Sequence, residues 1–315
     1  MTGVTDLRLN DLLSDPLGSG NVVVQSVVRN VGMEWQLYAV IAGALIVAAA
    51  VDLLQRRASL AKYGSRNART DMLHGLVEMS HIHVLILIAP VAASLNGYVD
   101  AQAPWLRLAD IAQLPIWAVL IIGVLATDFA CYWLHRLKHS NRWLWQFHKV
   151  HHSQEQLTVL TFFRFPVVDR FLDFLILFPL GIVTGSAELP VALLLLRQIR
   201  SLLEHSALDW DYGVVGRVIV SPAYHSVHHS RAPEHINRNF GILLTVWDRM
   251  FGTRAERGPG PIQYGLAHEH VPECFWRQNL APFEGLVRLI RNQPFPLPRD
   301  RSGSTVSASS EASAS

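Results

Sequence analysis

Histidines at helical spacing are the most informative feature of this sequence. Eight of them fall into three clusters, one of the pattern His-x-x-x-His and two of the pattern His-x-x-His-His. The clusters are His135 and His139; His148, His151 and His152; and His225, His228 and His229. Because helix positions three or four apart share one face, each cluster directs its imidazoles toward one point. Imidazole binds iron, zinc, copper and nickel. Eight ligands are too many for one ion and suit two, which predicts a dinuclear metal site.

The donor set narrows the chemistry. Imidazole ligation without thiolates leaves zinc, iron, copper or nickel open. A structural zinc would need only four ligands, and a hydrolytic site usually includes carboxylates, which are few near these clusters. Two irons that activate O2 to attack an unactivated C–H bond fit best, and a site at the membrane implies a lipid-like substrate.

The composition indicates a membrane protein. Of the 315 residues, 50% are apolar and 17% are charged, whereas about a quarter of a soluble chain is usually charged. The net charge of +2 is too small to indicate a nucleic-acid partner. The two cysteines, Cys131 and Cys274, support neither a disulfide framework nor an iron–sulfur cluster. The charged first thirty residues do not resemble a cleavable signal peptide.

Three apolar stretches approach the length of about 20 residues that a membrane-spanning helix needs. They cover residues 35–54, 81–99 and 114–134. Basic residues such as Arg56 and Arg57 follow the first stretch, which places that loop on the cytoplasmic side. The third span then returns the chain to the cytoplasm, so we expect the histidine site on the cytoplasmic face.

A fourth apolar stretch, residues 171–203, is interrupted by glycines, Glu188 and Pro190. Its halves are each short for a full crossing. The clusters can share one site only if His152 and His225 lie on the same side of the membrane. The stretch is therefore predicted to form a helical hairpin that enters the membrane and returns.

The predicted fold is all-α: an integral membrane bundle of about four transmembrane elements, one of them a hairpin, with a cytosolic helical cap carrying the histidine site. We divide the chain into an N-terminal extension (1–34), N-terminal transmembrane helices (35–115), a histidine-bearing domain (116–256), a C-terminal cytosolic segment (257–299) and a disordered tail rich in Ser and Ala (300–315).

Two residues of the third span lie close to the first cluster. Asp128 is two helical turns before His135 on the same face. It either fixes an imidazole tautomer or is a helix-buried aspartate paired with a nearby arginine. Tyr132 lies between them and either lines a substrate path or anchors the helix at the membrane interface.

These residues resemble the fatty acid hydroxylase/sterol desaturase superfamily. The matching stretches, over about residues 116–253, are His135-Arg-Leu-Lys-His139, His148-Lys-Val-His151-His152, His225-Ser-Val-His228-His229, Asp128-Phe-Ala-Cys-Tyr-Trp-Leu-His135, Asn239-Phe240-Gly241 and Trp247-Asp248-Arg249. The combination is specific to the superfamily but not to one member of it.

The resemblance implies two iron ions, O2 as co-substrate and an external electron donor, either a ferredoxin or a cytochrome b5-like protein with its reductase. It also adds two metal ligands, His205 in Glu204-His205-Ser206 and His235 in Pro233-Glu-His235. Related sequences tend to have Asp where this chain has Asn237, which weakens a carboxylate role at that position.

The expected function is a membrane-bound, O2-dependent di-iron oxidoreductase that hydroxylates a C–H bond of a lipid such as a sterol or a fatty acyl chain. A lipid desaturase is the alternative within enzymes. A histidine-rich metal transport or storage protein, or an inert lipid-binding relative, is the alternative of another class. Transporters place ligands near the bilayer midplane, whereas these clusters follow the end of a span, which disfavours transport.

Overall fold

The computed structural model describes residues 42–54, 60–80, 89–106, 114–184 and 200–295, with a few isolated positions between 39 and 87. The chain divides into two units, Met1–Val47 and Ala48–Ser315, and almost all described elements belong to the second. The described secondary structure is helical, with two isolated β-bridges, Ile219–Leu244 and Ser230–Tyr264. The all-α class is therefore confirmed.

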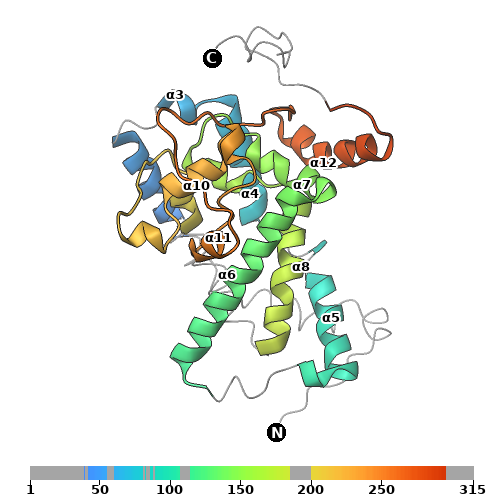
Figure 1. Cartoon of the computed structure of the whole chain (residues 1–315). Coiled ribbons are helices and arrows are strands. Elements are labelled where there is room, and N and C mark those ends of the chain that lie inside the picture. The colour runs from blue at the N-terminus through green and yellow to red at the C-terminus, as the bar shows by residue number, and fades with distance from the viewer. Residues whose placement is uncertain are drawn as a thin grey trace. The chain divides into compact units, whose positions relative to one another are not determined.

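The helix Ala42–Leu54 precedes the named helices. The named helices that follow are α3 (Leu60–Tyr63), α4 (Arg66–Met79), α5 (Ala89–Gln102), η2 (Pro104–Leu106), α6 (Ile116–Ser140), α7 (Arg142–His152), η4 (Val159–Phe163), α8 (Val167–Thr184), η5 (Val215–Arg217), α10 (Pro222–His228), η6 (Pro233–His235), α11 (Val246–Met250) and α12 (Phe275–Ile290). Helix α6 packs against α7 and α8, and α7 packs also against α12 (Figure 1).

Helix α6 extends the third predicted span through the first histidine cluster. From Trp117 to Ser140 it is the one helix, among the residues described, that is long and apolar enough to cross a membrane. It ends at Asn141, whose side chain accepts hydrogen bonds from the backbone N–H groups of Trp143 and Leu144 and so caps α7. A single residue thus separates α6 from α7, which holds the first two clusters next to each other.

The other predicted spans are described only in part. Helix Ala42–Leu54 covers the second half of the first predicted span and is shorter than a full crossing. Helix α5 (Ala89–Gln102) covers the second half of the predicted span 81–99. The four-span bundle and its cytosolic cap therefore remain predictions.

Helix α8 begins at Val167 and provides the first arm of the predicted hairpin. The turn of that hairpin falls within residues 185–199, which lie outside the described residues. The N-terminal extension (1–34) and the tail (300–315) lie outside them as well.

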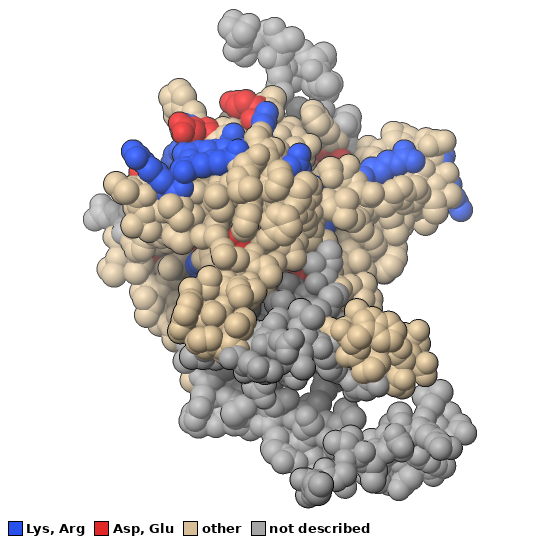
Figure 2. Space-filling view, turned by 60° about the horizontal axis from the view of Figure 1, so that its bottom comes forward, with Lys and Arg blue, Asp and Glu red and all other residues tan. Residues whose placement is uncertain are grey.

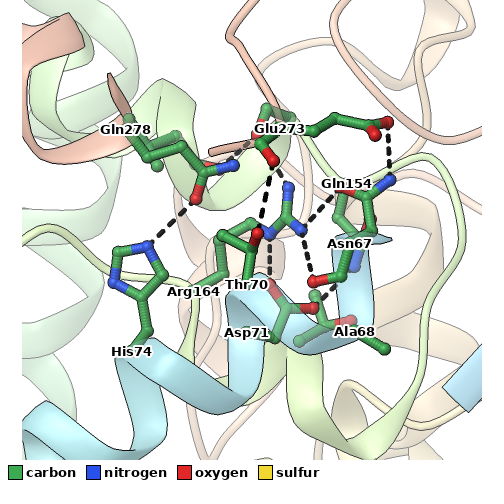
Figure 3. Close-up of polar contacts among 12 residues, drawn as sticks. Asn67, Ala68, Thr70, Asp71, His74, Gln154, Arg164, Glu273 and Gln278 are labelled. Carbon is green, nitrogen blue, oxygen red and sulfur yellow. Dashed lines mark hydrogen bonds and ion pairs between the residues drawn. The ribbon is translucent and has the colours of Figure 1, made fainter. Parts of the chain in front are cut away.

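A buried ion pair holds the chain that leaves α7 (Figure 3). The Arg164 side chain, 1% exposed, donates from Nε to Asp71 Oδ1 on α4 at 2.5 Å. The second oxygen of Asp71 accepts from Gln154 Nε2 at 2.7 Å, and Arg164 Nη1 donates to Ser153 Oγ at 3.3 Å. Because separating such a pair would leave a buried charge uncompensated, these contacts fix the C-terminal end of α7, where two of the histidines lie.

The same polar region joins α4 to α12 (Figure 3). His74 Nε2 and Gln278 Oε1 are 3.0 Å apart, and both residues are buried. Asn67 Nδ2 donates to Glu273 Oε1 at 2.9 Å just before α12 begins. Helix α7 is therefore held from two sides, by α6 through the Asn141 turn and by α4 and α12 through these contacts.

Candidate metal centre

Nine histidines converge into two groups. Within each group, one possible ligand atom of every histidine lies within 4.8 Å of those of all the others. The first group is His135, His139, His148, His152 and His228, and the second is His151, His205, His225 and His229. The structure thus brings together all eight histidines of the three clusters and adds His205.

Each His-x-x-His-His cluster contributes to both groups. On α7, His148 and His152 belong to the first group, and His151 belongs to the second. On α10 and its C-cap the assignment is reversed, because His225 and His229 belong to the second group and His228 to the first. Adjacent helix positions point about 100° apart, so two consecutive histidines cannot reach the same ion. The motif therefore places one i, i+4 pair in one group and the histidine between them in the other.

The imidazole nitrogens of the second group point at one another. His205 Nε2 lies 3.0 Å from His151 Nε2 and 3.1 Å from His225 Nε2. His225 Nε2 in turn lies 3.1 Å from His229 Nε2. Each Nε2 carries at most one hydrogen, so hydrogen bonds alone do not account for a nitrogen with two such neighbours. Ligands about 2.1 Å from a shared ion in a tetrahedral arrangement are about 3.4 Å apart, close to this spacing.

Four histidines donate a hydrogen bond from Nδ1 to an oxygen outside the groups. A carbonyl or carboxylate oxygen accepts, so Nδ1 carries the hydrogen and Nε2 presents its lone pair to the group. The pairs are His135 to Phe240 O at 3.1 Å, His228 to Arg238 O at 2.8 Å, His205 to Ser201 O at 2.8 Å and His148 to Asp169 Oδ2 at 3.2 Å.

Unpaired nitrogens test whether a metal fits. The Nε2 atoms of His139 and His148 are buried without a hydrogen-bond partner in the described structure. A buried polar atom left unpaired costs about 1–3 kcal/mol. Bound metal would satisfy both atoms, and an all-imidazole donor set suits a transition ion such as iron. The residues present therefore fit a pair of metal ions.

Burial keeps the imidazoles beyond α6 in the neutral form that binds metal. It holds the pKa values of His151, His152, His225 and His229 well below the ordinary value of histidine, and the neighbouring imidazoles lower them further. Burial lowers the pKa of His228 to about 3, although its hydrogen bond to the backbone opposes the shift. These side chains stay neutral at physiological pH without any change in the fold.

An ion pair that the sequence did not reveal lies beside the first group. Asp169, fully buried on α8, accepts from His148 Nδ1 and lies 2.8 Å from Lys138 Nζ on α6. Lys138 also contacts Asp173 at 2.6 Å. Burial alone would raise the pKa of Asp169, but the Lys138 ammonium and His148 hold it below its usual range. Lys138 lies between the basic residues Arg136 and Arg142 in the sequence, yet it is 2% exposed.

Asp128 contacts two backbone N–H groups and the Trp247 indole rather than an imidazole. Its carboxylate accepts from Leu243 N at 2.7 Å, Leu244 N at 3.0 Å and Trp247 Nε1 at 2.7 Å. These contacts match neither alternative given above, the tautomer-fixing carboxylate or the arginine pair. Asp128 instead anchors the loop that presents the Phe240 carbonyl to His135.

Tyr132 and His235 are both buried away from the two groups. Tyr132 is 0% exposed, and its hydroxyl lies 2.8 Å from Thr253 Oγ1, so it lines neither the membrane interface nor an open path. His235 Nδ1 lies 2.9 Å from Ser230 Oγ, and the residue belongs to neither group of histidines. Of the two additional histidines, His205 therefore belongs to a group and His235 does not.

A cavity of about 50 Å³ lies between the two groups and α8. It has room for a few water-sized molecules. Its walls are partly apolar and partly charged, and histidines of both groups line it. The lining residues are Cys131, Leu134, His135, Lys138, His148, His151, Phe165, Asp173, Ser201, Glu204, His205, His225 and Ile242.

Known proteins share this histidine-bearing region. Residues 120–253 match the family model for fatty acid hydroxylase. An alkylglycerol monooxygenase of Danio rerio is 34% identical over 48% of this chain and 33% of its own length. An ornithine lipid hydroxylase of Rhizobium tropici is 29% identical over 58% of this chain and 56% of its own length. A Delta(7)-sterol 5(6)-desaturase of Gibberella zeae is 31% identical over 58% of this chain and 48% of its own length. No solved structure matches the chain.

All ten predicted metal-binding histidines lie within the matched region. Residues 120–253 are similar to members of the fatty acid hydroxylase/sterol desaturase superfamily, in agreement with the sequence motifs. The chain spans between a third and a little over half of the length of these relatives.

Proposed function

We propose that this chain is a membrane-bound, O2-dependent oxidoreductase that hydroxylates, or alternatively desaturates, a C–H bond of a lipid. The observation that carries the proposal is the convergence of nine imidazoles into two adjacent buried groups. Five ligands for one ion and four for the other leave coordination positions open for a second reactant. The superfamily relatives act on lipids by both reaction types, according to their names.

In this proposal the first group of histidines holds one iron and the second group holds the other. When bound, two irons would supply the activation of O2 that an unactivated C–H bond requires. The chain's own contribution is to orient the ligands. Asp169 and the Phe240 carbonyl fix the rings of His148 and His135, and Ser201 fixes that of His205.

The cavity beside the two groups is the place where the reacting carbon would lie. Cys131, Leu134 and Ile242 give it an apolar wall, which excludes water from the reacting atoms. The cavity is too small for a whole lipid, so we infer that the rest of the substrate lies along the apolar surfaces of α6 and α8. The relatives' names point to a lipid with a polar head group or a sterol as the substrate class.

The reaction consumes electrons that an external donor must supply. The sequence contains no dinucleotide-binding glycine motif and no cysteine pattern for an iron–sulfur cluster. We therefore propose a ferredoxin or a cytochrome b5-like protein, with its reductase, as the donor on the cytoplasmic face of the membrane.

The first experiment is metal analysis of the full chain, expressed in iron-replete medium and extracted in mild detergent. The expected content is two irons per chain. Lipid candidates are then supplied with ¹⁸O2 and a reductant, and mass spectrometry detects the product. A product heavier by one ¹⁸O indicates hydroxylation, and a loss of two hydrogens indicates desaturation. A chain that holds two irons and converts none of the lipids named for its relatives would contradict the proposed substrate class. A chain that binds no metal would contradict the reaction itself.

A further inference from the structure

Helix α12 has its apolar face on the outside. Its buried residues are Gln278, Ala281, Pro282 and Gly285, which pack toward α7 and α4. Five of its eight large apolar side chains are 43% to 73% exposed, and they are Trp276, Leu280, Phe283, Val287 and Ile290. At about 100° per residue these five form one stripe on the side of the helix opposite the buried residues. This pattern is the reverse of that of a helix on the surface of a soluble domain.

The inward face of α12 is fitted closely to α7, so the helix cannot rotate to bury the stripe. A Cβ atom on Gly285 would lie 2.1 Å from Gln146 Oε1, and only glycine allows this approach. The Gln278 side chain is fully buried against His74. The apolar stripe is therefore held outward by specific contacts on the opposite face.

The apolar surface of α6 shows which medium faces the stripe. Exposed apolar side chains follow α6 at every fourth residue in a winding row: Trp117, Ile121, Leu125, Phe129, Trp133 and Leu137. The row is about 30 Å long at 1.5 Å per residue. A membrane hydrocarbon core is also about 30 Å thick. Phe129 and Trp133 also contact Trp247 and Phe251, whereas Leu137 lies at the end of the row. With α6 crossing the membrane, the upper limit of its lipid-facing surface is near Leu137.

Helix α12 packs against α7, the helix that directly follows α6. Leu137 is four residues before Asn141, the residue that caps α7, and Gln146 and Phe147 follow within about 9 Å of helix. Phe283, in the middle of the stripe, contacts the Phe147 ring at 6.0 Å between centroids. In Figure 1, α12 runs crosswise to α6 beside α7. With α6 crossing the membrane, the stripe lies close to where α6 leaves the hydrocarbon core.

The charged residues of α12 fit the same surroundings. Arg277, Arg288 and Arg291 lie together on one flank of the stripe with a single acid, Glu284, which pairs with Arg277 at 3.6 Å. Arginine beside an apolar stripe is typical of a helix that lies in the plane of a membrane containing anionic lipids. In Figure 2, Lys and Arg gather toward the upper border of the coloured surface, and few charges lie below them.

We propose that α12 lies in the interface of the bilayer, with its stripe among the upper parts of the lipid acyl chains and its arginines at anionic head groups. The inference depends on α6 crossing the membrane and not on the reaction catalysed. It gives the histidine-bearing helix α7 a support on the membrane surface through α12, in addition to its connection to α6.

Two adjacent positions on α12 provide the test. Phe283→Cys and Glu284→Cys differ by about 100° around the helix. Each is made in the full chain with Cys274→Ser, labelled with an environment-sensitive fluorophore and reconstituted in nanodiscs containing anionic and zwitterionic lipids. Buried Cys131 remains, and the Cys274→Ser chain alone gives the background labelling. The metal content of each variant, compared with that of the Cys274→Ser chain, shows whether it is folded. If the first pair loses metal, the pair Val287→Cys and Arg288→Cys is used in its place.

The expected result is a blue-shifted fluorophore at position 283 that brominated acyl chains quench and that aqueous iodide quenches several-fold less than at position 284. Equal quenching by iodide at both positions would overturn the proposal, because the stripe would then face water. Protection of position 283 from both quenchers would also overturn it, because protein would then cover the stripe. In that case, the number of chains in each nanodisc shows whether a second copy of this chain covers the stripe.

Discussion

Replacement of Asp169 by Asn tests how the chain orients its metal ligands. The substitution keeps the size of the side chain and removes its charge. In the structure the Asp169 carboxylate faces His148 Nδ1 at 3.2 Å on one side and Lys138 Nζ at 2.8 Å on the other. The two partners contact different oxygens of Asp169, and asparagine replaces one of these oxygens with an NH2 donor, so it cannot accept at both positions. We expect His148 to lose its fixed orientation.

Two magnitudes follow from the structure. Loss of a group that orients a metal-bound histidine typically costs about 10- to 100-fold in metal affinity. Removal of one partner from a buried ion pair costs about 3–5 kcal/mol of stability when the remaining charge is left alone. Because Lys138 keeps its contact with Asp173 at 2.6 Å, we expect a loss near the lower end, about 3 kcal/mol.

Asp173→Asn is the matched control. It removes the other carboxylate that contacts Lys138 but leaves the bond between Asp169 and His148 in place. Iron content after titration with a competing chelator reports the metal affinity, and thermal unfolding reports the stability. Both variants should unfold earlier than the wild type, and only Asp169→Asn should release iron at lower chelator concentration. Equal retention of iron by Asp169→Asn and the wild type would refute the reasoning.

Three further predictions concern histidines. His135→Ala and His205→Ala, one from each group, should each lower the iron content and abolish turnover; a fully active variant would exclude its histidine as a ligand. His235→Ala should keep both irons, because His235 belongs to neither group; loss of one iron would restore it as a ligand. Burial lowers the pKa of His74 to about 4, so below about pH 6.5 the unfolded chain binds more protons than the folded protein. Stability should therefore fall from pH 6.5 toward pH 4 by at most about 1.4 kcal/mol per unit, and chemical denaturation should show a smaller fall in His74→Gln; an unchanged fall would contradict this account.

Much of the candidate metal centre could be predicted from the sequence, because most of its histidines form local patterns on helices. The spacing of His135 and His139, and of each His-x-x-His-His cluster, fixes which imidazoles share a face. The length and apolarity of the third stretch predicted α6, which the structure extends to Ser140. The superfamily motifs supplied His205, which no helical spacing connects to the other ligands.

The tertiary structure decided the contacts between residues far apart in the chain. The basic neighbours Arg136 and Arg142 suggest that Lys138 is exposed on the surface. In the structure Lys138 instead forms ion pairs with two carboxylates that lie more than thirty residues later on α8. Asp128 lies on the same helix face as His135, but its carboxylate accepts hydrogen bonds from backbone N–H groups more than a hundred residues later in the chain. Spacing along one helix carries no information about such partners.

The sequence by itself indicated that the histidines of each cluster would share one face of a helix, since helical periodicity is a local property of the chain. Only the tertiary structure decided how the ligands divide, with His148, His152 and His228 on one side and His151 on the other. That division depends on how α7 and α10 are rotated against each other, and the rotation is set by contacts such as Asn141, Arg164 and the Phe240 carbonyl. The outward apolar face of α12 was decided in the same way, because an amphipathic pattern gives a helix two faces and only its packing partners determine which one is buried.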